Sequence, residues 1–297
     1  MKICLLGSTG IIGSDLALQL SHLSTVELVS LSSSDLDLYS YLQELETVLR
    51  EIQPQIIINA VGFTNIDAIA NHQNKGFFLN CLLPHILGEF CDRHSIQLIH
   101  FSSDNVFDGA KNSYYIEEDQ LSPINYYGWT KAHTDLLLLQ YFPHHSTIFR
   151  ISGIYSQNRK NFFTSFLHRL ATQKQLEVVN DIIVAPTPSR LVAKLITELI
   201  NNQKLFSLRG IYHLTPKGSS SWFDFANTIV SALQLSDKSI SPVSIESYST
   251  TVKRPRNCLL LSQKLEQETG LVLPHWEDEF REFITADGLQ SLIKQYF

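Results

Sequence analysis

Two residues in the stretch INYYGWTK could carry out proton chemistry together. Tyr127 and Lys131 lie four residues apart, so on a helix they share one face. A tyrosine ordinarily has a pKa of about 10, and a neighbouring ammonium, like the positive ring of an oxidised nicotinamide, is expected to lower it. Such a tyrosine can donate its proton to the alkoxide that forms as hydride reaches a carbonyl carbon. The Tyr-x-x-x-Lys spacing is common, however, and by itself it favours an ordinary surface pair.

A second polar group follows a buried strand. The sequence IQLIHFSSD places Ser103 and Asp104 directly after an apolar run. In a doubly wound sheet, residues just beyond the carboxyl ends of the strands face the ligand crevice. Ser103 is therefore expected to hydrogen-bond a substrate oxygen. Taken alone, a serine that caps a turn would be the better explanation.

A glycine-rich turn supplies the reason to expect a cofactor. LLGSTGIIG places Gly7, Gly10 and Gly13 at three-residue intervals between an apolar run and a helical pattern. Glycines there permit a tight turn and close backbone approach to a pyrophosphate, which the helix N-terminus stabilises. The turn follows a strand, opens a helix and begins an alternating pattern, which is the context that a dinucleotide-binding turn requires.

The end of the second predicted strand bears on which dinucleotide binds. An acid about 20 residues after the glycines would contact the ribose 2′-hydroxyl of NAD, but this chain has Ser32, Ser33 and Ser34 there. An acid would repel a 2′-phosphate, whereas serines can donate hydrogen bonds to it. The serines favour NADPH, no arginine supports them, and NADH stays an alternative.

The scaffold around these residues is predicted to be α/β. Strands and helices alternate through the first half: strands are expected at 2–7, 26–32, 55–61, 96–102 and 146–152, and helices at 11–23, 39–52, 76–94 and 127–140. Strands that are apolar on both faces indicate a Rossmann-type doubly wound parallel sheet. We expect an NAD(P)-binding domain at 1–150, with about 187–204 returning to it, and a smaller, mixed α/β substrate-binding lobe over most of 151–297.

Composition excludes several other classes of protein. Hydrophobic residues make up 44% of the 297 residues, charged residues 18%, and the net charge is −6. This balance argues against general binding to nucleic acid or an anionic membrane. The four cysteines are scattered and are expected to be free thiols without a disulfide or a metal site. No apolar run approaches a membrane span, and we expect a cytoplasmic protein.

These motifs together resemble the extended short-chain dehydrogenases/reductases. Within that superfamily the chain is similar to the dTDP-4-dehydrorhamnose reductase family along nearly its whole length. The stretches INAVGFTNID, SSDNVFDG and SPINYYGWTK in the first half are similar to family landmarks. In the second half APTPSRLVAKLI, GIYHLTPKGSSSWFDFA and RPRNCLLLSQKL followed by LPHW are similar as well.

The resemblance implies a set of site residues. Those expected to bind the cofactor are Gly7, Thr9, Gly10, Ile11, Ile12, Gly13, Ser32, Ser33, Asp37, Leu38, Ala60, Gly62, Phe63, Thr64, Tyr127 and Lys131. Those expected to bind or face the substrate are Ser103, Asp104, Asn105, Gly153, Arg254 and Asn257. For Arg254 and Asn257, contact with a nucleotide diphosphate and a role in loop structure are equally good interpretations. An arginine suits the first because its fork can bond phosphate bidentately.

The resemblance also implies a reaction. NADPH or NADH would deliver hydride to C4 of a 4-keto-6-deoxy sugar linked to dTDP, giving dTDP-L-rhamnose for surface polysaccharide. Tyr127 would protonate the oxygen, Lys131 would tune Tyr127 and hold the nicotinamide ribose, and Ser103 would orient the ketone. Two departures leave the sugar open, namely Asn105 for a tyrosine and Gly153 for a tryptophan that packs against the sugar.

Two other hypotheses remain at this point. The same fold could catalyse epimerisation or dehydration of a nucleotide sugar, but dehydratases usually add a second acid where this chain has Asn105. A non-catalytic NADP-binding subunit, resembling the regulatory subunit of methionine adenosyltransferase, could dispense with the Tyr127–Lys131 pair that this chain keeps. The resemblance also allows a homodimer, although no residue pattern demands one.

Overall fold

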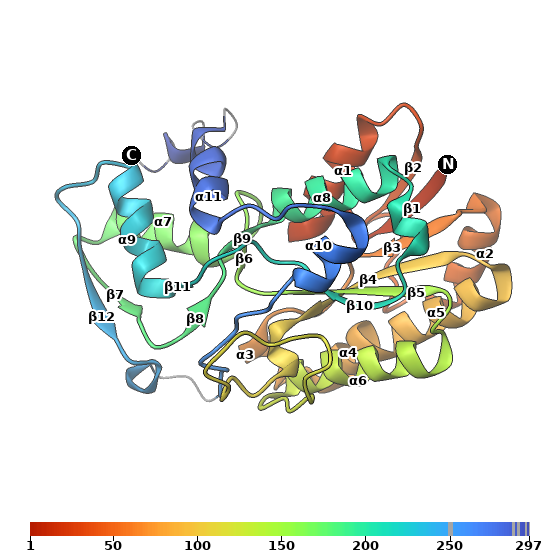
Figure 1. Cartoon of the computed structure of the whole chain (residues 1–297), viewed down its shortest axis with the longest axis horizontal. Coiled ribbons are helices and arrows are strands. Elements are labelled where there is room, and N and C mark those ends of the chain that lie inside the picture. The colour runs from red at the N-terminus through yellow and green to blue at the C-terminus, as the bar shows by residue number, and fades with distance from the viewer. Residues whose placement is uncertain (249–251, 287–288, 290–291, 295, 297) are drawn as a thin grey trace.

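Six parallel strands form the central sheet of the protein (Figure 1). The computed structural model describes residues 1–248, 252–286, 289, 292–294 and 296. The strand order is β10-β5-β4-β3-β1-β2, and every neighbouring pair is parallel. The strands are β1 (Lys2–Leu6), β2 (Glu27–Leu31), β3 (Ile56–Asn59), β4 (Gln97–Ser103), β5 (Ser146–Ile151) and β10 (Gly210–His213).

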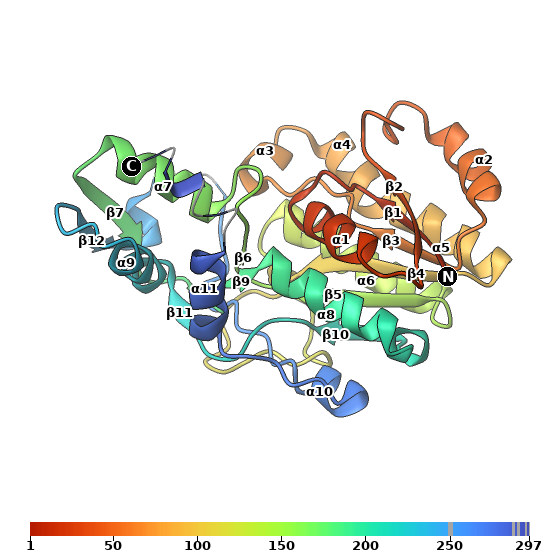
Figure 2. The ribbon, with the colours of Figure 1, turned by 90° about the horizontal axis from the view of Figure 1, so that it is seen from above.

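Helices cover both faces of this sheet. One face packs on α1 (Ile11–Ser21) and α8 (Ser189–Asn201), and the other on α2 (Leu42–Ile52), α5 (Leu83–His94) and α6 (Tyr126–Tyr141) (Figures 1 and 2). Alternate strand residues supply the two cores: Ile56 and Ile58 face one side, whereas Ile57 faces the other. β3, β4 and β5 are buried along their whole length, and the apolar residues that they carry on both faces indicate buried parallel strands. The predicted doubly wound α/β class is confirmed.

A smaller lobe lies beside the carboxyl ends of the strands, on the left in Figure 1. Its core is largely aromatic and includes Tyr155, Phe163, Phe225 and Phe283. The elements are β6 (Ile154–Tyr155), α7 (Phe162–Thr172), β7 (Gln175–Val179), β8 (Ile183–Val184), β9 (Thr187–Pro188), β11 (Ser220–Ser221), α9 (Trp222–Ala232), β12 (Ser239–Val243) and α11 (Trp276–Thr285).

Several short elements complete the structure. They are α3 (Ile66–Ile69), α4 (Gln73–Phe77), the π-helical turn η1 (Phe78–Leu82), the 3₁₀ turns η2 (Asp104–Val106), η3 (Lys204–Ser207) and η4 (Ile245–Ser247), and α10 (Gln263–Thr269). The helix expected at 76–94 is therefore interrupted by η1, and β10 is a sheet strand that the sequence pattern did not predict.

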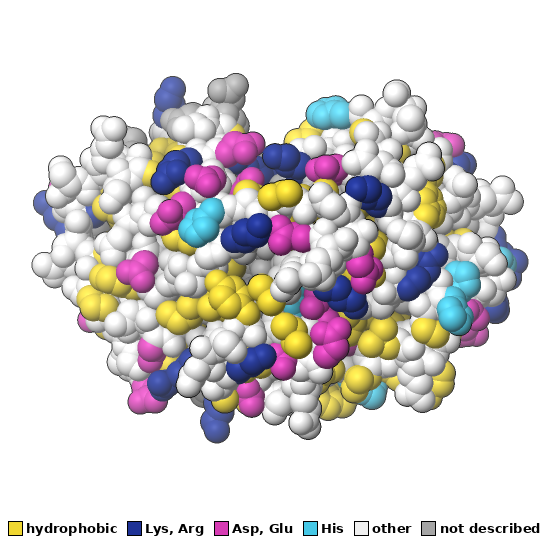
Figure 3. Space-filling model, in the orientation of Figure 1, with side chains coloured by type: hydrophobic (Ala, Val, Ile, Leu, Met, Phe, Trp, Pro, Cys, Tyr) yellow, Lys and Arg dark blue, Asp and Glu magenta, His cyan; other side chains and the backbone are white. Residues whose placement is uncertain are grey.

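The surface carries charges of both signs. On the face in Figure 3, Lys and Arg side chains are interspersed with Asp and Glu, with no broad area of one sign. Among the described residues, no helix combines the length and the apolar character needed to cross a membrane.

Candidate active site

The glycine cradle sits between β1 and α1, as its spacing predicts. Gly10 is the N-cap residue of α1, and Gly7 adopts a φ of +81° that favours glycine. A Cβ on Gly13 would lie 2.1 Å from the carbonyl oxygen of Gly7, so only glycine lets the helix approach the turn this closely. The cradle therefore leaves the N-terminus of α1 open to an anion such as a pyrophosphate.

A cleft of about 240 Å³ runs from this cradle along the carboxyl ends of β1, β2 and β3. Nine of the predicted cofactor-binding residues line it: Gly7, Thr9, Gly10, Ser32, Ser33, Asp37, Leu38, Ala60 and Gly62. The others, Ile11, Ile12, Gly13, Phe63, Thr64, Tyr127 and Lys131, do not contribute to its lining. The cleft also has lining residues that sequence reasoning missed, including Tyr39, Val61, Lys75, Leu79 and Arg159. The cleft thus joins the glycine cradle to the ends of β2 and β3, which is where a dinucleotide binds in a doubly wound sheet.

An acid does lie near the end of β2, but three residues after Ser32. Asp35 accepts hydrogen bonds from the Ser32 hydroxyl at 2.6 Å and from the Ser32 backbone at 2.8 Å. These bonds hold the pKa of Asp35 below its ordinary value. Ser33 is exposed at the cleft, and its side chain forms no hydrogen bond with another described residue. The chain thus keeps one serine at the position where a 2′-phosphate would lie.

Tyr127 and Lys131 come from the first turns of α6. Asn125 begins this helix by accepting a hydrogen bond from the backbone of Gly128 at 2.7 Å. A Cβ on Gly128 would lie 2.0 Å from the carbonyl oxygen of Asn105, so the helix packs directly on the turn that follows β4. This contact brings the Tyr127 side chain close enough to Ser103 for the serine hydroxyl to affect the pKa of the phenol.

Both members of the pair are buried, and burial dominates their ionisation. It raises the pKa of Tyr127 above its ordinary value, a rise that the Ser103 hydrogen bond opposes and that Asp104 and Asp135 reinforce. The lowered pKa expected for Tyr127 is therefore not found in the protein by itself, where desolvation is the largest effect on the phenol. Burial also lowers the pKa of Lys131 to about 8.

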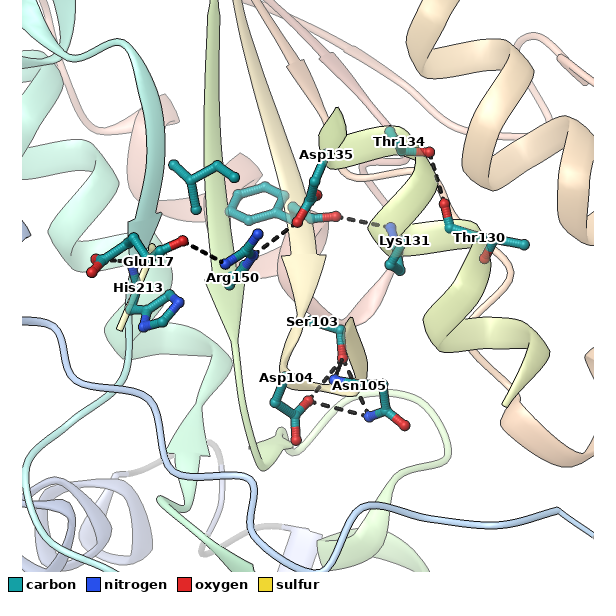
Figure 4. A network of polar contacts seen from close by, with 12 residues as sticks. Ser103, Asp104, Asn105, Glu117, Thr130, Lys131, Thr134, Asp135, Arg150 and His213 are labelled. Atoms are coloured by element: carbon teal, nitrogen blue, oxygen red, sulfur yellow. Dashed lines mark hydrogen bonds and ion pairs between the residues drawn. The ribbon is translucent and has the colours of Figure 1, made fainter. Parts of the chain in front are cut away.

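The amine of Lys131 is oriented by the sheet. Its Nζ donates to the carbonyl oxygen of Phe101 in β4 at 2.8 Å (Figure 4). Asp135, one helical turn further along α6, forms a buried ion pair with Arg150 of β5 at 2.8 Å. The charge of Asp135 opposes the effect of burial and favours the charged form of Lys131. Lys131 is thus fixed between the strand end and a buried carboxylate.

Ser103, Asp104 and Asn105 lie together at the end of β4, as Figure 4 shows. The Ser103 hydroxyl donates to Asp104 Oδ1 at 2.8 Å, and Asn105 Nδ2 donates to the same oxygen at 3.2 Å. Ser152 donates to the other oxygen at 3.3 Å. Burial raises the pKa of Asp104. By accepting these three hydrogen bonds, its carboxyl group holds Ser103, Asn105 and Ser152 together. All three are buried, and Asn105 is placed by its own hydrogen bonds.

Asn80 is a positioning residue that sequence reasoning missed. The π-helical turn η1 aims its side chain at Phe63, whose N–H donates to Asn80 Oδ1 at 2.7 Å and whose carbonyl accepts from Asn80 Nδ2 at 3.1 Å. Asn80 Nδ2 also donates to Thr130 of α6 at 3.0 Å. One amide therefore ties the segment after β3 to the helix that carries Tyr127. A π-turn is a frequent device at functional sites, but its sequence carries no sharp signal.

The remaining predicted substrate residues lie in different settings. Gly153 has a φ of +58°, and a Cβ there would lie 2.7 Å from the carbonyl oxygen of Ala185, so this backbone excludes a tryptophan. Arg254 pairs with Asp67 of α3 at 2.7 Å. Asn257 donates from Nδ2 to the carbonyl oxygens of Lys111 and Ser113 at 2.6 and 2.8 Å, which gives its amide a role in loop structure.

The arrangement has a definite chemical capacity. The phenol of Tyr127 lies near the Ser103 hydroxyl, and the buried amine of Lys131 lies next to Gly62, which lines the cleft. A carbonyl oxygen placed between Tyr127 and Ser103 could accept a hydrogen bond from one and a proton from the other.

Comparison with known proteins identifies the family. The RmlD substrate binding domain family matches residues 1–288. A dTDP-4-dehydrorhamnose reductase of Sinorhizobium fredii is 31% identical over 96% of this chain and 97% of its own. The one from Escherichia coli K12 is 29% identical over 93% of this chain and 95% of its own.

Solved structures agree with this assignment. The structure of a dTDP-4-dehydrorhamnose reductase from Clostridium acetobutylicum is similar at 27% identity with a TM-score of 0.88, over 98% of this chain and 100% of that one. One from Bacillus anthracis, solved in complex with NADP, has 25% identity and a TM-score of 0.87, over 95% of this chain and 98% of that one. A dTDP-glucose 4,6-dehydratase from Bacillus anthracis, at 16% identity, shares the fold. The chain belongs to the RmlD substrate binding domain family, and the dTDP-4-dehydrorhamnose reductases are its relatives along nearly the whole chain.

Proposed function

We propose that this protein is an NADPH-dependent oxidoreductase that reduces the 4-keto group of dTDP-4-dehydro-L-rhamnose to give dTDP-L-rhamnose. The observation that carries the proposal is the placement of Tyr127 close to Ser103, with Lys131 next to Gly62 of the glycine-lined cleft. The reductases among the relatives, one of them solved with NADP, support both the reaction and the cofactor.

The chain's own residues would divide the chemistry among them. A bound NADPH contributes a hydride for C4 of the sugar. Tyr127 then gives its phenolic proton to the C4 oxygen. The Ser103 hydroxyl would turn its one proton from Asp104 to that oxygen and orient it by a hydrogen bond. Lys131, held by the carbonyl of Phe101, would bind the nicotinamide ribose. Gly62, with the neighbouring Phe63 and Thr64, would line the nicotinamide end of the cleft.

We assign the two lobes separate tasks. Residues 1–150, together with about 187–204, would bind the cofactor, and most of 151–297 would bind the nucleotide sugar. The packing of α8 on α1 and the aromatic core of the second lobe support this division. Asp104, Asn105, Gly153, Arg254 and Asn257 would face or shape the substrate site, with Asn257 acting through the loop that it stabilises.

One assay tests the proposal. Purified protein, NADPH and dTDP-4-dehydro-L-rhamnose are mixed, and NADPH oxidation is followed by absorbance. We expect oxidation that depends on the sugar, with NADPH preferred over NADH. If the wild-type protein binds NADPH but oxidises none of it with this sugar or a panel of other keto sugars, a regulatory or epimerase role replaces the reductase assignment.

A further inference from the structure

A cation from the second lobe reaches the glycine cradle of the first. Arg159, between β6 and α7, donates from Nε to the carbonyl oxygen of Thr9 at 2.8 Å, across 150 residues of chain. The preceding residue, Asn158, donates to the hydroxyl of Ser14 in α1 at 3.3 Å. The loop before α7 is thus docked on the turn that would hold the cofactor phosphates.

The backbone of Arg159 adopts a conformation that L side chains rarely take. Its φ is +60°, in the left-handed region. Its carbonyl oxygen accepts from Thr164 Oγ1 at 2.9 Å and from Asn161 Nδ2 at 3.1 Å. Asn161 is the N-cap of α7, so the cap of that helix holds the strained residue in place. Such strain persists where the surroundings enforce it, and it concentrates at ligand clamps and active sites.

Arg159 adds positive charge at a particular point of the cleft. Among the described residues that line it, the cations are Arg159 and Lys75. Lys75 lies 5.2 Å from the ring centroid of Tyr39, on the β2 side, whereas Arg159 contacts the cradle itself. Of the five guanidinium N–H groups, only that of Nε bonds to a described residue, which leaves the terminal nitrogens for an anion.

We propose that Arg159 clamps the diphosphate of the bound dinucleotide against the N-terminus of α1, so that the second lobe takes part directly in binding the cofactor. The inference rests on the proposed function, because it requires the cleft to hold NADPH. Backbone N–H groups of the helix N-terminus would hold the diphosphate from one side. The planar fork of the guanidinium would bond to it from the other.

The test measures nucleotide binding directly. Wild type, Arg159→Ala and Arg159→Gly are titrated with NADPH and with NADH, and the nucleotide fluorescence gives each Kd. Because the diphosphate is common to both nucleotides, we expect both variants to bind NADPH and NADH about ten- to a hundredfold more weakly, by the same factor for each. The exposed neighbour Lys160, outside the cleft lining, provides the control Lys160→Ala, which should bind as wild type does.

The glycine variant separates a lost guanidinium from a disturbed loop. Glycine suits a positive φ and alanine does not, so a loop defect would be repaired in Arg159→Gly but not in Arg159→Ala. Equal weakening in both variants supports the clamp, and recovery of affinity in the glycine variant overturns it. Loss of NADPH binding alone would also overturn it, because Arg159 would then contact the 2′-phosphate.

The inference and the proposed function fail in different ways. If wild type binds both nucleotides and Arg159→Ala binds them equally well, only the clamp is overturned. If wild type binds neither nucleotide, the proposed function and the clamp are both overturned. Binding of both nucleotides without sugar-dependent oxidation leaves the clamp measurable and removes the reductase assignment alone.

Discussion

Tyr127 is buried beside a serine and two carboxyl groups, and this environment favours its neutral form. The raised pKa keeps the phenol protonated at neutral pH, which is the form that a proton donor must have. The alkoxide that hydride addition creates is a stronger base than an ordinary phenolate, so the proton still moves toward the substrate. A buried, neutral tyrosine therefore suits reduction better than the lowered pKa that its spacing from Lys131 first indicated.

Replacing Tyr127 by phenylalanine removes the acid and little else. We expect kcat/KM of Tyr127→Phe to fall about a hundredfold or more, the usual contribution of a positioned general acid. The Kd for NADPH should change little, because the ring keeps its packing. Steady-state kinetics and nucleotide titration on the same preparation check both. Full activity in the variant would show that another group protonates the sugar.

Lys131 is predicted to lower the stability of the folded protein, because its ammonium group is buried. Folding lowers its pKa from 10.5 to about 8, so the unfolded chain binds more protons between these values and stability rises with pH across that window. The penalty for burying the ammonium is fully present below pH 8 and disappears by about pH 10.5. Below pH 8 this penalty lowers the free energy of unfolding by roughly 3 kcal/mol, from about 1.36 kcal/mol per pKa unit.

The variant Lys131→Met removes this penalty. It should unfold at a higher temperature than wild type at neutral pH, and the advantage should shrink as the pH rises from 8 toward 10.5. Its reductase activity should be lost. Thermal melts over a pH series provide the measurement, and a difference in melting temperature that stays constant with pH would mean that Lys131 is not a buried cation.

At the scale of elements, the position of α6 depends on contacts at its N-terminus. Asn125 caps the helix and also donates to Asn105 at 3.1 Å and to the carbonyl of Lys253 at 3.0 Å. Gly128 allows the first turn to rest on the backbone of Asn105. Because Tyr127 lies between these two residues, its distance from Ser103 is set by how closely helix and turn approach each other.

Gly128→Ala tests this dependence. The new Cβ would meet the carbonyl oxygen of Asn105 at 2.0 Å, so helix and turn must separate. We expect a loss of about 1–3 kcal/mol of stability, as for other overpacked sites, and a fall in kcat that exceeds the change in KM for NADPH. Leu136→Ala, at a 54% exposed position of the same helix, is the matched control and should alter neither. Normal kcat in Gly128→Ala would show that the close approach does not position Tyr127.

Short sequence patterns predicted most of the helices and strands of the first half. The features that they did not predict depend on contacts between residues far apart in the sequence. Strands β3 to β5 are buried along their length and carry apolar residues on both faces, while Tyr127 and Lys131 are related by spacing within one helix. Asn80 reaches Thr130 across 50 residues and Arg159 reaches Thr9 across 150, so no short motif could reveal them. β10 is four residues long, and only its pairing with β5 identifies it as part of the main sheet.

At the scale of the molecule, the two lobes meet around the mouth of the site. The segment before β6 continues from β5, and the loop at 252–258 returns to pair with α3 through Arg254 and with the region after β4 through Asn257. Arg159 joins the cradle from the same lobe. The cofactor and substrate sites would therefore both include residues of the second lobe, so that a substitution in this lobe can change the binding of either ligand.

Arg254 allows the substrate role of this loop to be separated from its structural role. The ion pair with Asp67 is 2.7 Å long, with Arg254 half-buried and Asp67 exposed, and solvent-accessible pairs of this kind contribute about 1 kcal/mol or less. If Arg254 contacts the nucleotide diphosphate, Arg254→Ala should raise KM for the sugar about tenfold while leaving the melting temperature and the Kd for NADPH nearly unchanged. Asp67→Ala breaks the same pair but keeps the guanidinium, so its KM should stay the same or fall. An equal rise in KM for both variants would instead assign the pair to holding the loop, and steady-state kinetics with the sugar as the varied substrate distinguishes the two outcomes.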